Sequence, residues 1–284
     1  MPTPTPFQQA ADLIAQADSL IVAAGAGMGV DSELPDFRGT QGFWRAYPAL
    51  ARAQVQFEQV ASPASFERDP RLGWGFYGHR LALYRRTVPH EGFTMLRRWG
   101  EAKARGYGVF TSNVDGQFQK AGFVPNLVHE CHGSILHLQC MEPCSDAIWE
   151  ADAFAPEVDE ETGLLSNAPP RCPRCGGLAR PNVLMFGDWG WVGDRSAAQA
   201  RRMEQWLATL ERPVVVELGA GTAIPSVRHF SEQVLRRRGG ALVRINPREC
   251  EVPAGADRGR GGRAVGLACG GLEGLREIEL HSRC

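Results

Sequence analysis

Four of the eight cysteines are spaced like the ligands of a metal ion. Three residues separate Cys140 from Cys144, and two separate Cys172 from Cys175. Two such pairs supply four thiolates, which is the tetrahedral set that zinc prefers. The glycines that follow Cys175 let backbone amides point at the sulfurs. The spacing therefore favours a zinc site over disulfides or unligated core thiols.

A different chemistry is indicated around His132, because histidine titrates near neutrality and can serve as a general base. Further polar side chains follow the apolar run 108–111, namely Ser112, Asn113 and Asp115. Such side chains can bind a polar ligand. Asn and Asp also form turns after strands, so each residue taken alone leaves a purely structural role open.

Two short glycine loops follow apolar runs: Gly25-Ala26-Gly27 and Gly219-Ala220-Gly221. Glycines at this place let backbone amides approach a phosphate at the start of a helix. Both loops lack the third glycine of the dinucleotide pattern, and a tight structural turn explains the first loop equally well. The second loop is also similar to that of methyltransferases, but such a loop normally opens its domain, and this one lies near the end of the chain.

The elements that must position these residues are visible as alternating apolar runs and amphipathic segments. Continuous apolar runs, typical of buried parallel strands, occupy 19–24, 108–111, 214–218 and 241–245. Helical periodicity marks about 7–17, 196–210 and 226–238. This alternation predicts an α/β fold with a doubly wound parallel sheet of the Rossmann kind.

Two stretches break the alternation and are interpreted as insertions. Residues 33–100 are rich in aromatic side chains and mostly helical in pattern, whereas 138–181 contain the four spaced cysteines. The expected organisation is a discontinuous Rossmann-like domain (1–32, 101–137 and 182–284), a helical cofactor-loop segment (33–100) and a small zinc module (138–181).

Composition excludes several classes of protein. The chain has 284 residues, of which 43% are hydrophobic and 22% charged, and a net charge of -1. This is ordinary globular composition without the basic excess of nucleic-acid-binding proteins. No apolar run reaches the roughly 20 residues of a membrane span, and no export signal is visible. We therefore expect a cytoplasmic protein that binds neither nucleic acid nor membrane, and expect it to be a monomer.

A family resemblance emerges when the motifs are taken together. Residues 25–39 (GAGMGVDSELPDFRG) resemble the cofactor loop of the sirtuins, which are NAD-dependent protein lysine deacylases. Four further segments resemble sirtuin motifs in family order: 111–115 (TSNVD), 132–134 (HGS), 180–188 (RPNVLMFGD) and 245–246 (IN). The resemblance runs from about residue 7 to about residue 275.

The resemblance implies both an activity and roles for individual residues. The activity is removal of an acyl group from lysine in a protein or peptide, with release of nicotinamide and O-acyl-ADP-ribose. It makes His132 the base, gives Asn113 and Asp115 catalytic contacts with the cofactor, and makes the zinc structural. The implied NAD-binding residues are Gly25, Ala26, Gly27, Asp36, Phe37, Arg38, Ser112, Asn113, Asp115, Gly219, Ala220, Gly221 and Asn246. Substrate backbone would pair with Leu184, Phe186 and Gly187.

The acyl group is suggested by Tyr77 and Arg80, whose i, i+3 spacing places both side chains on one helix face. They are similar to the pair with which one sirtuin branch accepts succinyl, malonyl or glutaryl lysine. That branch also has a small residue where Ala61 stands. An arginine fork binds a carboxylate well. In the alternative interpretation, Tyr77 packs and Arg80 pairs with an acid on a solvated face.

Three positions depart from the family pattern, namely Gly29 for serine, Glu33 for glycine and Ser112 for glutamine. These departures keep two other hypotheses open. One is an NAD glycohydrolase or ADP-ribosyltransferase that uses the same pocket, and the other is a non-catalytic module that senses NAD or ADP-ribose.

Overall fold

The first helix begins where its capping residues predict. The computed structural model describes residues 4–35, 39–253 and 263–282, and α1 spans Pro6–Gln16. The Thr5 hydroxyl accepts a hydrogen bond from the Gln8 amide, 3.2 Å away, and Pro6 occupies the first helical position. Both features stabilise a helix start.

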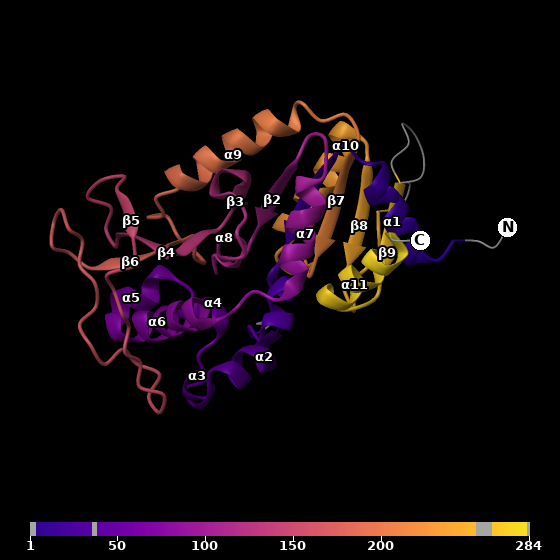
Figure 1. Ribbon diagram of the computed structural model, residues 1–284. Helices are drawn as coiled ribbons and strands as arrows, with labels where there is room; N and C mark the ends of the chain where they lie inside the picture. Colours follow the sequence, from indigo (N-terminus) through magenta and orange to yellow (C-terminus); the bar gives the residue numbers. More distant parts are fainter. Residues whose placement is uncertain (1–3, 36–38, 254–262, 283–284) are drawn as a thin grey trace.

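The main sheet contains six strands in the order β3-β2-β1-β7-β8-β9, and all five pairings are parallel. Its strands are β1 (Ser19–Ala24), β2 (Tyr107–Thr111), β3 (Val128–Glu130), β7 (Pro213–Leu218), β8 (Ala241–Ile245) and β9 (Arg263–Leu267). In order of appearance this is the 3-2-1-4-5-6 arrangement of a Rossmann fold, so the predicted α/β class is confirmed. The strand order reverses between β1 and β7, and Figure 1 shows β7 and β8 on one side of the sheet and β2 and β3 on the other.

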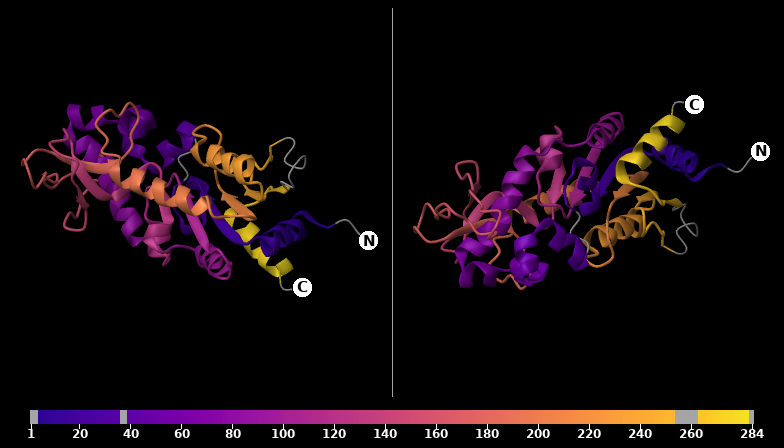
Figure 2. Two further views of the ribbon diagram at one scale, coloured as in Figure 1. Left: turned by 90° about the horizontal axis from the view of Figure 1, so that it is seen from above. Right: turned by 90° about the horizontal axis from the view of Figure 1, so that it is seen from below.

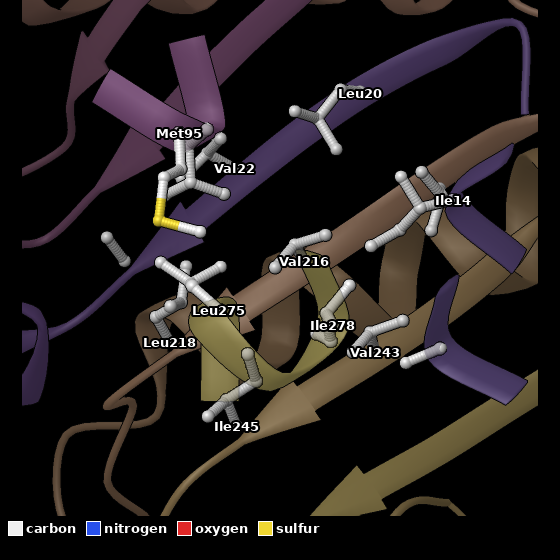
Figure 3. Close-up of a cluster of buried hydrophobic side chains, with 14 of the residues drawn as sticks. Ile14, Leu20, Val22, Met95, Val216, Leu218, Val243, Ile245, Leu275 and Ile278 are labelled. Atoms are coloured by element: carbon white, nitrogen blue, oxygen red, sulfur yellow. The ribbon is translucent and has the colours of Figure 1, made fainter. Parts of the chain in front are cut away.

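Helices cover both faces of this sheet. One face packs against α1, α7 (Glu91–Glu101) and α11 (Gly271–Ser282), and the other against α9 (Asp194–Leu207) and α10 (Ser226–Arg238). Along β1, Leu20 and Val22 join the first core and Ile21 and Ala23 the second, as Figure 3 shows for the first. Burial on both faces explains why the strands are continuously apolar.

Within the described stretches, no helix has both the length and the apolar character that crossing a bilayer demands.

The two insertions lie together at one end of the molecule (Figures 1 and 2). The first forms the helices α2 (Gly39–Ala46), α3 (Pro48–Arg52), α4 (Phe57–Val60), α5 (Pro63–Arg68) and α6 (Pro70–Arg86). The second belongs to an antiparallel sheet ordered β5-β4-β6, with β4 at Gly133–Cys140, β5 at Ile148–Glu150 and β6 at Ala179–Val183.

The insertions share one hydrophobic core. Trp74 and Tyr77 of α6 belong to the same buried cluster as Leu138 of β4 and Val183 of β6. The Trp74 indole also donates a hydrogen bond of 2.9 Å to the Ala179 carbonyl. The domain limits proposed from the sequence stay predictions, but the helical segment and the small sheet are packed as one body.

The remaining short elements lie in loops around the main sheet. They are η1 (Ala26–Ser32), α8 (Gln117–Lys120) and η2 (Pro125–Leu127).

Candidate active site and metal centre

Most of the predicted functional residues lie in loops at a single edge of the main sheet. Because all its strands are parallel, the loops that follow them emerge at the same edge, which is where such sheets bind ligands. These loops carry Gly25–Gly27 after β1, Ser112–Asp115 after β2, His132 after β3, Gly219–Gly221 after β7 and Asn246 after β8. The fold thus gathers residues that lie more than 200 positions apart in the chain.

The two glycine loops touch each other at the point where the strand order reverses. The Gly27 amide donates to the Gly219 carbonyl at 3.1 Å, and the Gly25 amide donates to Leu218 at 3.0 Å. Gly219 has a positive φ of 58°, and a Cβ there would lie 2.4 Å from the Gly27 Cα. Only glycine fits such a close approach. The glycine positions of the two loops therefore present backbone without side chains at the place where Rossmann folds bind a dinucleotide. This geometry fits NAD.

Two departures from the family pattern lie in η1 and directly after it. Glu33 adopts a left-handed conformation with φ of 63°, which glycine reaches at lower cost. At Gly29 an added Cβ would lie 3.0 Å from the Leu34 side chain, so the missing side chain makes room for Leu34. The predicted cofactor residues Asp36, Phe37 and Arg38 lie outside the described residues.

His132 is half-buried at the end of the loop after β3. Burial lowers the pKa of its imidazole below the ordinary 6.5, and a hydrogen bond with the Ser112 backbone opposes this effect. The ring is therefore neutral at pH 7 and can accept a proton. Its Nε2 lies 3.3 Å from the Ser226 hydroxyl at the start of α10. Sequence analysis missed Ser226, because a serine at a helix start looks like an ordinary cap.

Gly133 brings the predicted substrate segment to this histidine. It has a φ of 78°, and a Cβ would lie 2.1 Å from the Asn182 carbonyl, so the position needs glycine. Gly133 pairs with Val183 where β4 meets β6. The Leu184 amide then donates to the His132 carbonyl at 2.9 Å. The segment that starts at Leu184 therefore lies directly beside the candidate base.

The loop after β2 is hydrogen-bonded to the first glycine loop. The Asn113 side chain donates to the Gly25 carbonyl at 3.0 Å, which joins this loop to the first glycine loop. Asp115 is buried, and its carboxylate accepts a hydrogen bond from the Gln117 amide at 2.9 Å. The pKa of Asp115 is raised to about 6, mainly by burial and also by the Glu130 charge, while the hydrogen bond from the Gln117 amide and the Arg80 charge oppose the shift.

The raised pKa of Asp115 predicts a pH-dependent cost to stability. The folded pKa of about 6 exceeds the ordinary 3.8, so the cost is absent below pH 4, develops as the pH rises to 6 and is constant above it. Asp115→Asn removes the charge and retains an acceptor. We expect this variant to gain roughly 2 to 3 kcal/mol in unfolding free energy at pH 8 and almost nothing at pH 4. Urea unfolding of both proteins at the two pH values checks this, and an equal gain at both would contradict it.

The predicted acyl-binding residues face the protein interior. Tyr77 is 1% exposed and stacks on Phe66, and Arg80 is 9% exposed. Arg80 Nε donates to the Tyr84 hydroxyl at 2.8 Å, and the guanidinium lies over the Tyr77 and Tyr84 rings. The solvated-face alternative for Arg80 is therefore wrong, although Tyr77 does pack. Tyr84, one turn further along α6, was not anticipated from the sequence.

The predicted substrate segment is joined to the Ala61 region. The Phe186 amide donates to the Ala61 carbonyl at 3.0 Å, and its ring packs edge-on against Phe57. Gly187 follows with a φ of 65°. The amides of Leu184 and Phe186 already donate within the protein, so an added peptide strand would pair with other backbone groups here.

Asn246 connects the loop after β8 to the second glycine loop through side-chain hydrogen bonds. It is 1% exposed, its side-chain amide donates to the Ala220 carbonyl at 2.9 Å, and its oxygen accepts from the Arg248 and Glu249 amides at 3.0 Å each. The side chain thus fixes the second glycine loop relative to β8. Its predicted contact with NAD stays a prediction.

The four spaced cysteines converge. Their sulfur atoms all lie within 4.8 Å of one another, with 3.6 Å between Cys140 and Cys175 and 3.7 Å between Cys144 and Cys172. Tetrahedral zinc with Zn–S bonds of about 2.3 Å places its sulfurs about 3.8 Å apart, whereas a disulfide needs about 2.05 Å. The Gly177 amide also points at the Cys175 sulfur, 3.4 Å away. The cluster fits zinc and excludes the disulfide alternative for these thiols.

Comparison with known proteins agrees with this geometry. The model of the Sir2 family matches residues 25–206. An NAD-dependent protein deacylase of Pyrococcus furiosus is 31% identical, over 89% of this chain and 92% of its own length. The NAD-dependent protein deacylase 2 of Pyrobaculum aerophilum is 32% identical, over 90% and 91% respectively.

Solved structures resemble the same fold along almost the whole chain. The crystal structure of a Sir2 homolog–NAD complex superposes with a TM-score of 0.70 and 24% identity, covering 97% of this chain and 93% of that one. A mutant Sir2 homologue in complex with ADP-ribose gives a TM-score of 0.69 and 24% identity, covering 97% of this chain and 96% of that one.

Proposed function

The chain belongs to the Sir2 family, and on this basis we propose that it is an NAD-dependent protein lysine deacylase. The observation that carries the proposal is the neutral imidazole of His132. It is hydrogen-bonded to the backbone of Ser112, in the loop that Asn113 joins to Gly25, and the His132 carbonyl accepts from the amide of Leu184. A neutral imidazole in this position can accept a proton from a bound dinucleotide while an extended peptide lies beside it. The products would be deacylated lysine, nicotinamide and O-acyl-ADP-ribose.

Individual residues then take the following roles. The backbone of Gly25–Gly27 and Gly219–Gly221 would hold the phosphates of NAD, which supplies the ribose that receives the acyl group. Asp115 and Asn113 would orient the nicotinamide and its ribose. His132 would take a proton from a ribose hydroxyl, since burial keeps its imidazole neutral at pH 7. The Leu184–Gly187 segment would align the peptide beside it.

One assay tests the proposal against its alternatives. The protein is incubated with NAD and either acetylated or succinylated peptide, and the products are identified by mass spectrometry. Free lysine together with O-acyl-ADP-ribose supports the deacylase. Nicotinamide release without peptide would support an NAD glycohydrolase. Binding of NAD without any turnover would support a sensing module.

We further propose that acidic acyl groups are accepted through Arg80. A buried guanidinium beside the Tyr77 and Tyr84 rings can pair with a carboxylate, which would be costly to bury alone. Arg80→Met is expected to lower kcat/KM for a succinylated peptide by about 100-fold and for the acetylated peptide only a few-fold. Steady-state kinetics with both peptides checks this.

Arg86→Met is the matched control, because Arg86 lies on the same helix with an exposed side chain. It should affect both substrates little. Equal losses on the two peptides in Arg80→Met would refute the role of Arg80 and leave general deacylation untouched.

The cysteine cluster bears on where the enzyme works. Four thiols close enough to bind one zinc ion must stay reduced, and this is the normal condition of the cytoplasm. We therefore propose a cytoplasmic location. A monomeric state is a separate proposal.

A further inference from the structure

Exposed apolar side chains are concentrated in one short segment. Of the described residues, eight large apolar side chains are exposed, and three fall within six consecutive positions. These are Leu184 at 39%, Phe186 at 37% and Trp189 at 100% exposure. Single exposed apolar residues are ordinary, but three within six positions, next to the candidate base, indicate a binding surface. We call Leu184, Phe186 and Trp189 the apolar strip.

The loop that presents Trp189 is fixed on its amino-terminal side by a buried carboxylate. Asp188 accepts from the Met185 amide at 3.2 Å, from the Gly190 amide at 3.1 Å and from Arg180 at 2.5 Å. The side chains of Asp188 and Arg180 are 0% and 1% exposed. A buried ion pair with additional hydrogen bonds holds the backbone in one arrangement.

Two buried amides fix the carboxyl-terminal side. Gln139 donates to the Gly190 carbonyl at 2.7 Å and accepts from the Val192 amide at 3.0 Å. Asn182 donates to the Val192 carbonyl at 2.8 Å. Gln139 and Asn182 are 0% and 1% exposed. The loop is thus anchored before and after Trp189, while the indole itself contributes nothing to the core.

A rigid loop that holds a fully exposed indole is suited to recognition, because no ordering of the loop opposes binding. The apolar strip overlaps the proposed substrate segment Leu184–Gly187 and extends it to Trp189. It starts at Leu184, whose amide donates to the His132 carbonyl. We propose that Trp189 is a specificity residue that binds an apolar or aromatic side chain of the substrate protein, a few residues from the acylated lysine. This inference rests on the proposed deacylase function and refines its substrate class.

Acetyl-lysine peptides that carry Gly, Leu, Trp, Arg or Asp at each of the four positions on either side of the lysine test the proposal. At one position, the Leu and Trp peptides should have KM values about tenfold below that of the Gly peptide. Trp189→Ala should reduce this ratio to less than about twofold, and Trp189→Phe should retain most of it. Because Trp189 is fully exposed, both variants are expected to fold.

Val124→Ala is the matched control. Val124 is 49% exposed and precedes η2 and β3, so it lies before the amino-terminal end of a strand, whereas the candidate site lies at the carboxyl ends. This variant should keep the tenfold ratio. A ratio unchanged in Trp189→Ala, or a preference for Arg over Leu, overturns the inference. If no peptide is deacylated, the proposed function fails. In that case the binding of the same peptides is measured by calorimetry. A lower Kd for the Leu peptide than for the Gly peptide supports the inference, and equal Kd values refute it.

Discussion

His132→Ala is expected to lower the rate of peptide deacylation by a factor on the order of 10³, within the range of about 10² to 10⁴ that general-base catalysis supplies. The imidazole is held by the Ser112 backbone and lies 3.3 Å from the Ser226 hydroxyl. Alanine removes the proton acceptor, and the half-buried position gives solvent little access to replace it. The measurement is formation of O-acyl-ADP-ribose from NAD and acetylated peptide.

His129→Ala is the appropriate control for this variant. His129 lies three residues earlier, within β3, where its ring packs edge-on against Phe110 and lies 3.4 Å from the Ser196 hydroxyl. It should retain activity within a few-fold. If His132→Ala kept more than about a tenth of the wild-type rate, another group would have to be the base.

Removal of zinc is expected to have the second large effect, on folding. A four-thiolate zinc site contributes on the order of 10 kcal/mol. We expect a strong chelator, or Cys172→Ser, to lower Tm by roughly 10 to 20 °C. Circular dichroism and metal analysis of the purified protein check this. Deacylation should fall together with stability, because β4 and β6 belong to the same buried cluster as α6.

Cys250→Ser is the matched control, because Cys250 is a half-buried thiol outside the four-cysteine cluster. Its zinc content and Tm should be close to those of the wild type. A full zinc equivalent retained by Cys172→Ser, or a Tm indifferent to the chelator, would show that the cluster does not hold a structural ion.

Much of the main sheet could be predicted because its interior strands are buried on both faces. Ser19–Ala24 and Pro213–Leu218 are buried at every position, and continuous apolar runs of this kind stand out in a sequence. The edge strands could not be predicted in the same way. Val128–Glu130 has only three residues and includes a charged one, and it becomes a strand only through its pairing with β2.

The candidate site was predictable to the extent that its residues directly follow strands. Asn113, Asp115 and His132 lie in such loops, so chain order and fold class place them together. Contacts made through packing were not predictable. The Phe57–Phe186 contact joins residues 129 positions apart, and the pairing of Arg80 with Tyr84 depends on which face of α6 is buried.

The common core of the two insertions has a consequence for engineering. An attempt to transplant the acyl specificity of a relative by exchanging α6 alone would place foreign side chains against Leu138 and Val183 of the small sheet. Such chimeras should express poorly, however well the exchanged residues suit the new acyl chain. A transplant that moves α2 to α6 together with β4 to β6 keeps most of that core together, so we expect it to change what this enzyme accepts at a lower cost in stability.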